Sequence, residues 1–434
     1  MALERLAPTI SGLAVAIVLV SPAPARGQFT EYTQPGEPRA RGRVEREQLE
    51  QAAEEARWRL GPVRVDPWLA LRNLSWHENP NASAEDEPEA ESDLSGNVGA
   101  GLRGYLRTGP DVHWAFHALP EYVWWADQTE RRRLNGRYGL GLFGYFNRLT
   151  LQATGRRTEE LRIVTYELPE EANTRTDQLA LSSELALGSV LSLAGEVSRS
   201  RIRNLLNEEE RESGPPLQLL DRDEELARAG LYFRPGTRWR LGAGVEWTAT
   251  DSAPDARDLS STGEAPFLDL SYEGPKISGG AGLERRSLEP DPGSEFVATD
   301  TTTAHLQAAL QGNRISPSVY ARRSLALSIF EGYSHFETEL AGASVSLVLG
   351  RRSGVRVFAE AGRSDYVARS PAVPERRDDL SAFGGAVTLE LWRSARLELG
   401  AQRAEFDSNL PGQDRALTTV QAGVTFGTGQ GDWY

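Results

Sequence analysis

The sequence predicts an all-β protein, specifically a transmembrane antiparallel up-and-down β-barrel of about 18 strands (about 16 to 18) with a short N-terminal helical segment. Three observations support this prediction. Apolar and polar residues alternate with a period of two from residue 63 to near the C-terminus, as in strands whose two faces meet different solvents. Tight turns alternate with longer polar stretches. A short apolar run near the N-terminus is typical of a secretory signal.

Composition limits the classes of protein that remain. The chain has 434 residues, a net charge of −14, 39% hydrophobic and 25% charged residues, and no Cys. This is too apolar for a disordered chain, and the absence of Cys excludes disulfides, thiolate metal sites and a Cys nucleophile. An acidic balance without a basic half argues against nucleic acid as a partner. Abundant Gly, Trp and Tyr favour strands and turns over a helical bundle.

Residues 1–25 are predicted to be a signal peptide. The run Leu13–Val20 is the most apolar in the chain, Arg5 precedes it, and Ala23-Pro24-Ala25 follows as a cleavage site of the A-x-A type. The run is shorter than the ~20 apolar residues of a membrane-spanning helix, and the alternative interpretation is a buried N-terminal helix. No other stretch could span a membrane as a helix, so a membrane location requires a β-barrel.

Residues 26–62 are predicted to form a periplasmic N-terminal segment with one amphipathic helix. From Val44 to Leu60, apolar residues recur at helical spacing among Glu and Arg. Two interpretations remain open, namely a plug or partner-docking helix and a short stub packed at the barrel rim. The apolar positions are Leu49, Ala52, Ala53, Ala56 and Leu60.

Residues 63–429 are predicted to form the barrel itself. The segment Arg238–Thr248 shows the alternation most clearly, and its apolar face begins and ends in Trp239 and Trp247, as expected at the two interfaces of a membrane. Because the signal of a single barrel strand is weak, the evidence is its repetition. Similar alternation is present in Trp114–Trp124, Val355–Ala361, Phe383–Leu391 and Val420–Phe426.

The connections between these segments alternate in length. Short turns on one side and long loops on the other are typical of outer-membrane barrels, and an even strand count places both chain ends on the short-turn, periplasmic side. We therefore expect eighteen strands. The predicted tight turns are 108–111, 146–148, 187–189, 234–237, 273–276, 311–314, 350–353 and 393–395. The predicted long loops are 78–93, 167–176, 204–223, 251–262, 288–301, 366–379 and 407–414.

A β-propeller is the competing fold, since blades of about 40 to 45 residues would match the spacing of the turns. However, each period divides into two long strands rather than four short ones, and no Gly-His or Trp-Asp signature recurs. A periplasmic array of β-sandwiches is less compatible still with this pattern.

The motifs that suggest chemistry are better explained as strand sequence, so no catalytic, cofactor-binding or metal site is predicted. Gly139–Gly144 matches GxGxxG but lies within an alternating run rather than between a strand and a helix. His113 and His117 would lie ~13 Å apart on a strand, too far to share a metal. An outer-membrane lipase or protease using His305 or His335 remains the enzymatic alternative, without a supporting Gly-x-Ser-x-Gly turn.

Charged residues within the alternating segments are the candidates for lining a pore. An Arg facing lipid at mid-depth would cost ~2–4 kcal/mol, so these residues should face water or each other inside the barrel. A barrel of this size is wide enough for an aqueous channel unless loops fill it. The predicted pore-lining residues are Arg103, Arg238, Arg240, Glu246, Arg356, Glu360, Arg363, Glu390, Arg396 and Glu398.

Two charged runs could contact the membrane surface. The acidic run Glu85–Glu91 could bind divalent cations near lipopolysaccharide, or it is simply a solvated loop. The run Arg131–Arg133 follows Trp124-Trp125 and could contact lipid phosphates or form a solvated rim.

The first predicted strand carries a family resemblance. Residues Gly61–Asn79, which read Gly-Pro-Val-Arg, then Pro and alternating apolar residues, resemble the opening of a family of bacterial outer-membrane β-barrel porins that often accompany exopolysaccharide systems. The end of the chain, with Val420–Phe426 alternating and Trp433-Tyr434 following, is similar to barrel assembly signals. The resemblance implies a cell outer-membrane location. The implied partners are outer-membrane lipid and lipopolysaccharide, the barrel assembly machinery and, as a further candidate, polysaccharide.

The function that these observations predict is a porin-like passive channel for small polar solutes or a polysaccharide, without a cofactor. The first alternative is a non-conducting structural or scaffold barrel, plugged by loops or by the N-terminal helix. The second alternative is a barrel enzyme.

Overall fold

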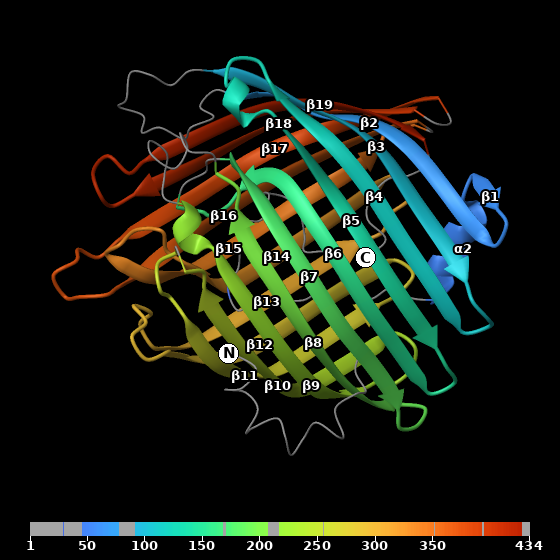
Figure 1. Ribbon diagram of the computed structural model, residues 1–434, viewed down its shortest axis with the longest axis horizontal. Coiled ribbons are helices and arrows are strands. Elements are labelled where there is room, and N and C mark those ends of the chain that lie inside the picture. The colour runs from blue at the N-terminus through green and yellow to red at the C-terminus, as the bar shows by residue number, and fades with distance from the viewer. Residues whose placement is uncertain are drawn as a thin grey trace.

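Eighteen long antiparallel strands close into a barrel over the part of the chain that the structure describes (Figure 1). The computed structural model describes residues 29, 46–77, 92–167, 171–206, 217–254, 256–350, 352–392 and 395–427. Each strand pairs with its sequence neighbours, and the last strand pairs with the first to complete the ring. The predicted fold class and the count of eighteen are confirmed. The predicted signal peptide and the acidic run 85–91 lie outside the described residues.

The wall consists of strands of 12 to 16 residues. In chain order they are β2 (Val63–His77), β3 (Asp93–Arg107), β4 (Val112–Trp125), β5 (Arg133–Tyr145), β6 (Leu149–Ile163), β7 (Glu171–Ala186), β8 (Leu191–Asn204), β9 (Arg222–Phe233), β10 (Trp239–Ser252), β11 (Ser261–Glu273), β12 (Ile277–Pro290), β13 (Thr299–Leu310), β14 (Ile315–Leu327), β15 (Tyr333–Val348), β16 (Ser353–Ala368), β17 (Arg377–Trp392), β18 (Ala395–Ser408) and β19 (Arg415–Gly427).

Short and long connections are segregated to opposite ends of the barrel. All eight predicted tight turns coincide with short connections between consecutive strands. The long connections join strands at the other end, and two of them, 126–132 and 328–332, were not among the predicted loops. We call these the short-turn end and the long-loop end. β2 begins and β19 finishes at the short-turn end, as an even strand count requires.

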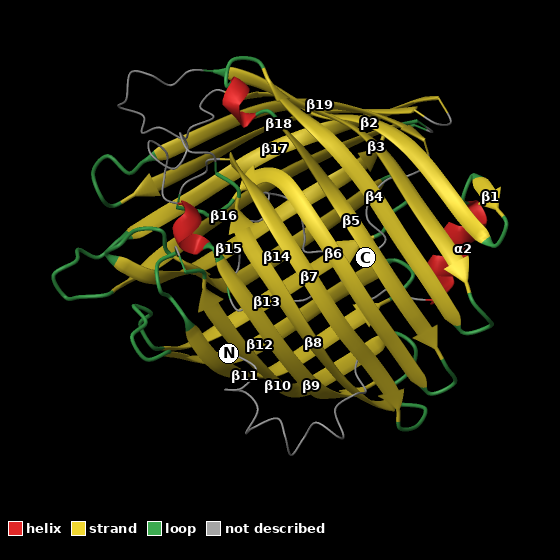
Figure 2. Cartoon of the chain, viewed as in Figure 1, coloured by secondary structure: helices red, strands yellow, loops and turns green. Residues whose placement is uncertain are grey.

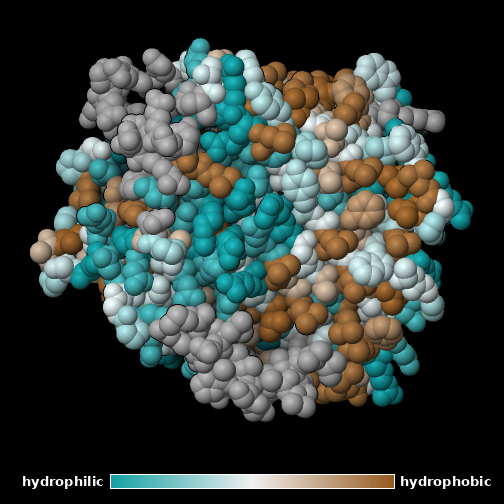
Figure 3. Space-filling model, viewed as in Figure 1, coloured by the Kyte–Doolittle hydropathy of each residue, from teal (hydrophilic) through white to brown (hydrophobic). Residues whose placement is uncertain are grey.

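Strand β10 shows how the alternating sequence builds a two-sided wall. Trp239 and Leu241 point outward and are 45% and 42% exposed, whereas Glu246 points inward and is fully buried. Gly244 permits close packing of neighbouring strands, because a Cβ there would lie 2.0 Å from the carbonyl oxygen of Ala229. In Figure 3, brown apolar side chains cover the wall toward the short-turn end, and teal predominates toward the long-loop end.

The helix of the N-terminal segment is shorter than the sequence predicts. Helix α2 spans Arg46–Glu55, and residues Trp58–Leu60 form strand β1, which pairs with the start of β2 (Figure 2). The sequence predicted helix through Leu60, but Gly61 has a φ of 62° and reverses the chain into a hairpin, which frees the preceding residues to join the sheet. Among the described residues, no helix has the length and apolarity needed to cross a bilayer.

Candidate functional site

The interior wall of the barrel is the candidate site, and strand register determines which charges reach it. Eight of the ten predicted pore-lining residues lie on the inward face of their strands. They differ in solvent exposure, because some are buried in ion pairs and others are exposed. The eight are Arg103, Arg240, Glu246, Arg356, Glu360, Glu390, Arg396 and Glu398.

The other two predicted residues are corrected by the structure. Arg363 lies on the outward face of β16, where its Nε donates to Asp379 Oδ1 at 3.1 Å. The reason is parity, since an odd separation of seven residues places Arg363 on the face opposite Arg356. Arg238 precedes β10 in an exposed tight turn, and its carbonyl accepts the backbone N–H of Glu273 at 2.9 Å.

A buried cluster of charges occupies the inward face of β9–β12. Arg228 lies 2.8 Å from Glu246 and 2.6 Å from Asp269, and Arg286 lies 2.9 Å from Glu246 and 2.8 Å from Glu284. The side chains of Arg228, Glu246, Glu284 and Arg286 are at most 6% exposed. Each of these charges takes part in an ion pair within the wall, so the cluster stabilises this part of the barrel rather than binding a solute.

Near the short-turn end of β16–β18, inward-facing charges instead remain in contact with water. Glu390 and Glu398 are exposed although their strand positions place them inside the barrel, and Arg356 is half-exposed. These three side chains form no ion pair with another described residue. This section of the wall therefore presents unneutralised charge of both signs to water in the lumen.

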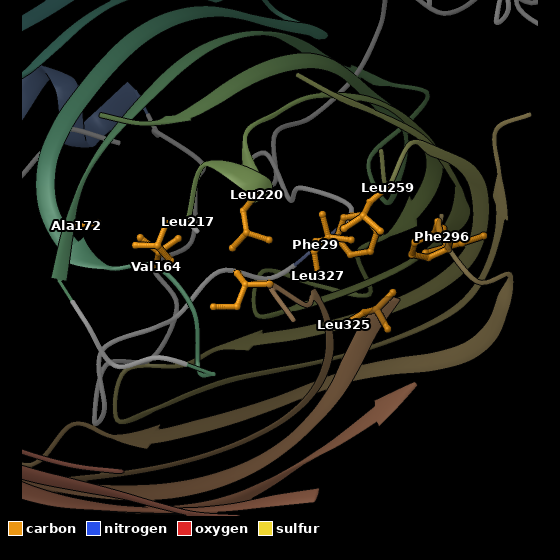
Figure 4. Close-up of a cluster of buried hydrophobic side chains, with 11 residues drawn as sticks. Phe29, Val164, Ala172, Leu217, Leu220, Leu259, Phe296, Leu325 and Leu327 are labelled. Carbon is orange, nitrogen blue, oxygen red and sulfur yellow. The ribbon is translucent and has the colours of Figure 1, made fainter. Parts of the chain in front are cut away.

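At the long-loop end, loops from opposite sides of the barrel meet in one apolar cluster, which we call the loop cluster. Val164 follows β6, whereas Leu325 and Leu327 belong to β14, eight strands further around the ring of eighteen. Figure 4 shows the side chains of the cluster extending from Ala172 in β7 to Phe296 in the loop after β12, so the cluster crosses the lumen. Its members are Phe29, Val164, Ala172, Leu217, Leu220, Leu259, Leu288, Phe296, Leu325, Leu327 and Ile329.

Glu167 fastens the loop after β6 to the loop after β14. Its Oε1 accepts the hydroxyl of Ser328 at 2.6 Å, and its Oε2 accepts the backbone N–H of Ile329 at 2.7 Å. The side chain is only 3% exposed, and burial raises the pKa of this carboxyl to about 7. Arg257 adds a further tie by donating to the carbonyl of Phe330 at 2.8 Å. Sequence analysis did not identify Glu167, because no local pattern links residues so far apart in the chain.

Helix α2 narrows the opposite mouth of the barrel. Leu49 is buried against Tyr105, Ala115 and Phe143, all of which face inward from β3–β5. Arg46 donates to the carbonyl of Pro110 at 3.0 Å in the first short turn. The helix therefore packs on the inner wall at the short-turn end.

The motifs that suggested chemistry have packing roles. Gly139 lies against the buried His117, and a Cβ there would approach the imidazole Cε1 at 2.4 Å, so this glycine of the GxGxxG run makes room for a ring. His335 is fully buried and stacks on Phe296 at 5.0 Å. Over the described residues, no group of three or more His, Asp or Glu side chains could hold a metal ion.

No protein-family model matches the sequence, and no curated protein is similar to it in sequence. Solved structures do share its architecture. OccK9 (OpdG) of Pseudomonas aeruginosa aligns with a TM-score of 0.52 at 10% identity, over 84% of this chain and 98% of that one. OccAB3 of Acinetobacter baumannii aligns with a TM-score of 0.50 at 11% identity, over 84% and 99%. Both are outer-membrane β-barrel porins, and at this identity the likeness is one of fold.

Proposed function

We propose that the protein is an outer-membrane, porin-like channel through which small polar solutes diffuse passively. The observation that carries the proposal is the wall near the short-turn end, where Arg356, Glu390 and Glu398 face water inside a closed ring of strands. Charged side chains on the inward face, combined with an outward face that is apolar toward the short-turn end, suit a barrel that separates lipid from an aqueous lumen. The fold shared with OccK9 and OccAB3 supports the same location and class of function.

The proposed mechanism selects solutes by width and charge. The loop cluster and the tie at Glu167 reduce the cross-section at the long-loop end. Beyond them, a solute meets carboxylates and a guanidinium on the wall of β16–β18. Opposing charges along a lumen orient polar solutes without binding them tightly enough to stop their passage.

A polysaccharide is a more specific candidate for the transported solute. The resemblance of residues 61–79 to porins that accompany exopolysaccharide systems motivates it. Current block by oligosaccharides of increasing length, added to either side of a bilayer, would distinguish this solute class from small polar molecules.

Single-channel recording of the detergent-purified mature protein in a planar bilayer tests the channel. Stable conductance steps with an ion preference are expected. Glu390→Gln combined with Glu398→Gln should lower the preference for cations, because two carboxylates leave the lumen, whereas Asp379→Asn on the outward face should not change it. A folded protein that inserts but never conducts would overturn the proposal.

The loop cluster supports a second candidate, a plugged barrel with a structural role. Its apolar side chains reach across the lumen from β6–β7 to β14. If the cluster is a complete plug, wild-type protein will not conduct, and Leu259→Ala with Phe296→Ala will open it. If it is a constriction, wild-type protein will conduct and the same variant will carry more current.

A further inference from the structure

Over β6–β17, the outward face of the barrel changes from apolar to charged between its two ends. Toward the short-turn end it is apolar, with side chains such as Leu179, Leu191 and Leu231 exposed. Toward the long-loop end it carries cross-strand ion pairs, which we call the ionic belt. Its pairs include Arg157–Asp177, Arg175–Glu159, Arg199–Asp223, Arg285–Asp300, Arg323–Glu337, Arg363–Asp379 and Arg377–Asp365.

A groove of about 740 Å³ lies where the apolar surface meets the ionic belt, across β5–β8. Leu140 and Leu179 supply outward-facing apolar side chains, and Gly155 leaves space between them because it has no side chain. Arg199 and Arg201 of β8 flank the polar side of the groove. One end of the groove therefore suits a hydrocarbon chain and the other suits an anion.

The guanidinium groups at this groove have donors to spare. Arg157, Arg199 and Arg201 are 51%, 50% and 55% exposed. Arg157 and Arg201 each use only Nε in their ion pairs, with Asp177 at 2.5 Å and Asp223 at 3.4 Å. A guanidinium has five N–H donors, so both terminal nitrogens of each group remain available to a ligand.

The arginines here also have more N–H donors than their carboxylate partners use. Asp223 is shared among three arginines of β8, at 3.0 Å from Arg199, 3.4 Å from Arg201 and 2.6 Å from Arg203. Glu225 adds a longer contact of 3.6 Å to Arg199. Asp177 and Asp251 lie on the same outward face, so the charges are balanced and the spare capacity is one of N–H donors. An anion carrying several oxygens would accept these unused N–H donors, and arginine binds phosphate through paired N–H···O bonds.

We propose that this groove binds a phosphate-bearing lipid of the membrane leaflet on the long-loop side. The phosphate lies against Arg157, Arg199 and Arg201, and an acyl chain runs along Leu140 and Leu179 toward the apolar surface. The inference rests on the proposed membrane location, but it does not depend on whether the lumen conducts.

Binding of lipid A to the detergent-purified protein, measured by native mass spectrometry, tests the groove. Arg199→Gln with Arg201→Gln should weaken binding about tenfold by removing charge-assisted contacts. The matched control is Arg363→Gln with Arg377→Gln, which removes two arginines of the ionic belt from β16 and β17, and it should weaken binding less than about twofold. Equal weakening in both variants would show a general charge effect and overturn the proposal.

Two further ligands test which part of the lipid the groove recognises, the phosphate or the acyl chains. Diacylglycerol lacks the phosphate and should bind the wild-type protein weakly, and inorganic phosphate lacks the acyl chains and should not displace lipid A. If inorganic phosphate displaces it, the groove is a site for free phosphate. If diacylglycerol binds as well as lipid A, the groove is only apolar.

Folding and conduction are checked on the same variants. Heat-modifiable mobility on a detergent gel reports the folded barrel, and Arg199→Lys with Arg201→Lys replaces the Gln variant if that variant fails to fold. The Lys variant keeps the charge but loses paired hydrogen bonding, so binding should still weaken. Conductance should be unchanged in all of them. If the barrel conducts but the two variants bind lipid A equally, only the lipid-binding inference is wrong. If the groove variant alone loses lipid A but the barrel never conducts, only the channel proposal is wrong.

Discussion

Glu246 is a fully buried charge of the inner wall, and it pairs with two arginines. It contacts Arg228 at 2.8 Å and Arg286 at 2.9 Å while remaining fully buried. Buried ions are tolerated only when paired, so the three residues must be judged as a unit rather than as separate stabilising contacts.

Glu246→Ala should therefore destabilise the barrel by about 3–5 kcal/mol, because it removes a short buried ion-pair contact from Arg228 and another from Arg286. Asp379→Ala breaks a solvent-exposed pair with Arg363 and should cost about 1 kcal/mol or less. Denaturant titration of each variant in detergent, followed by tryptophan fluorescence, gives the comparison. Equal losses from the two changes would contradict the view that burial sets the cost.

Glu167 should make the contact between the two crossing loops sensitive to pH. Its folded pKa of about 7 lies above its ordinary value of 4.5 because burial disfavours the charged carboxylate. The contribution to stability is then complete below about pH 4.5 and is lost as the pH rises through about 7. We expect hydrogen-exchange protection of the Ile329 amide, corrected for intrinsic rates, to fall between about pH 5.5 and about pH 8.5.

Glu167→Gln should remove most of that pH dependence, because the amide stays neutral and can still accept from Ile329 and donate to Ser328. Glu375→Gln, an exposed change in another long loop, is the control and should leave the dependence intact. A wild-type contact that is equally protected at both pH values would argue against the role given to Glu167.

At the scale of elements, helix α2 is held by the buried Leu49, with Ala52 and Ala53 packed beside it, and by a few polar contacts. Leu49→Asp should release it from Tyr105, Ala115 and Phe143, because a carboxylate would have to be buried without a partner. A spin label on a single cysteine at Glu54, which is exposed, should become mobile in the variant. Gln51→Asp, on the exposed side of the helix, is the control and should leave the mobility of the label unchanged. If Leu49→Asp also leaves the mobility unchanged, the helix is held by other contacts and the prediction is wrong.

Turns and strands could be predicted from sequence because their signals are local. The eight tight turns have polar, Gly or Asn residues between alternating runs, and each was found where expected. The loop 328–332 was missed because it is not polar: Ile329 is buried, and Ser328 is fully enclosed. The length of α2 was overestimated because apolar spacing continues past Glu55, while the hairpin at Gly61 depends on a sheet partner.

The lumen could be predicted only in part. The alternation of the sequence predicted which strand face carries charge. It failed for Arg363, which lies an odd number of residues from Arg356 and therefore on the opposite face. Nothing in the sequence distinguishes Glu246, enclosed by arginines, from Glu398, exposed to water. That difference depends on Arg228 in the adjacent strand and on Arg286 two strands away. The contact between Glu167 and Ser328 depends on loops from opposite sides of the ring.

At the scale of the whole molecule, the two ends of the barrel are chemically different and should face different compartments. The long-loop end carries the ionic belt and the loop cluster, and the short-turn end carries α2 and both ends of the wall. The absence of native Cys makes single-cysteine labelling unambiguous.

We expect Glu375→Cys, in the long loop after β16, to react with a membrane-impermeant maleimide in intact cells. Lys276→Cys, in the short turn after β11, should react only after the outer membrane is opened. Both native residues are exposed, so access to the compartment is the variable that differs. Labelling of Lys276→Cys alone in intact cells would reverse the proposed orientation.

β2 is the first strand of the wall to be synthesised and β19 is the last, yet the two are hydrogen-bonded neighbours. Until β19 arrives, any partial wall has two open edges whose N–H and C=O groups can pair with another chain. Contacts between such distant parts of a chain also form slowly. A chain that stops before Arg415 would therefore not form a slightly smaller barrel but would be a template for aggregation. The cell must also shield the β2 edge throughout the synthesis of the strands that follow it.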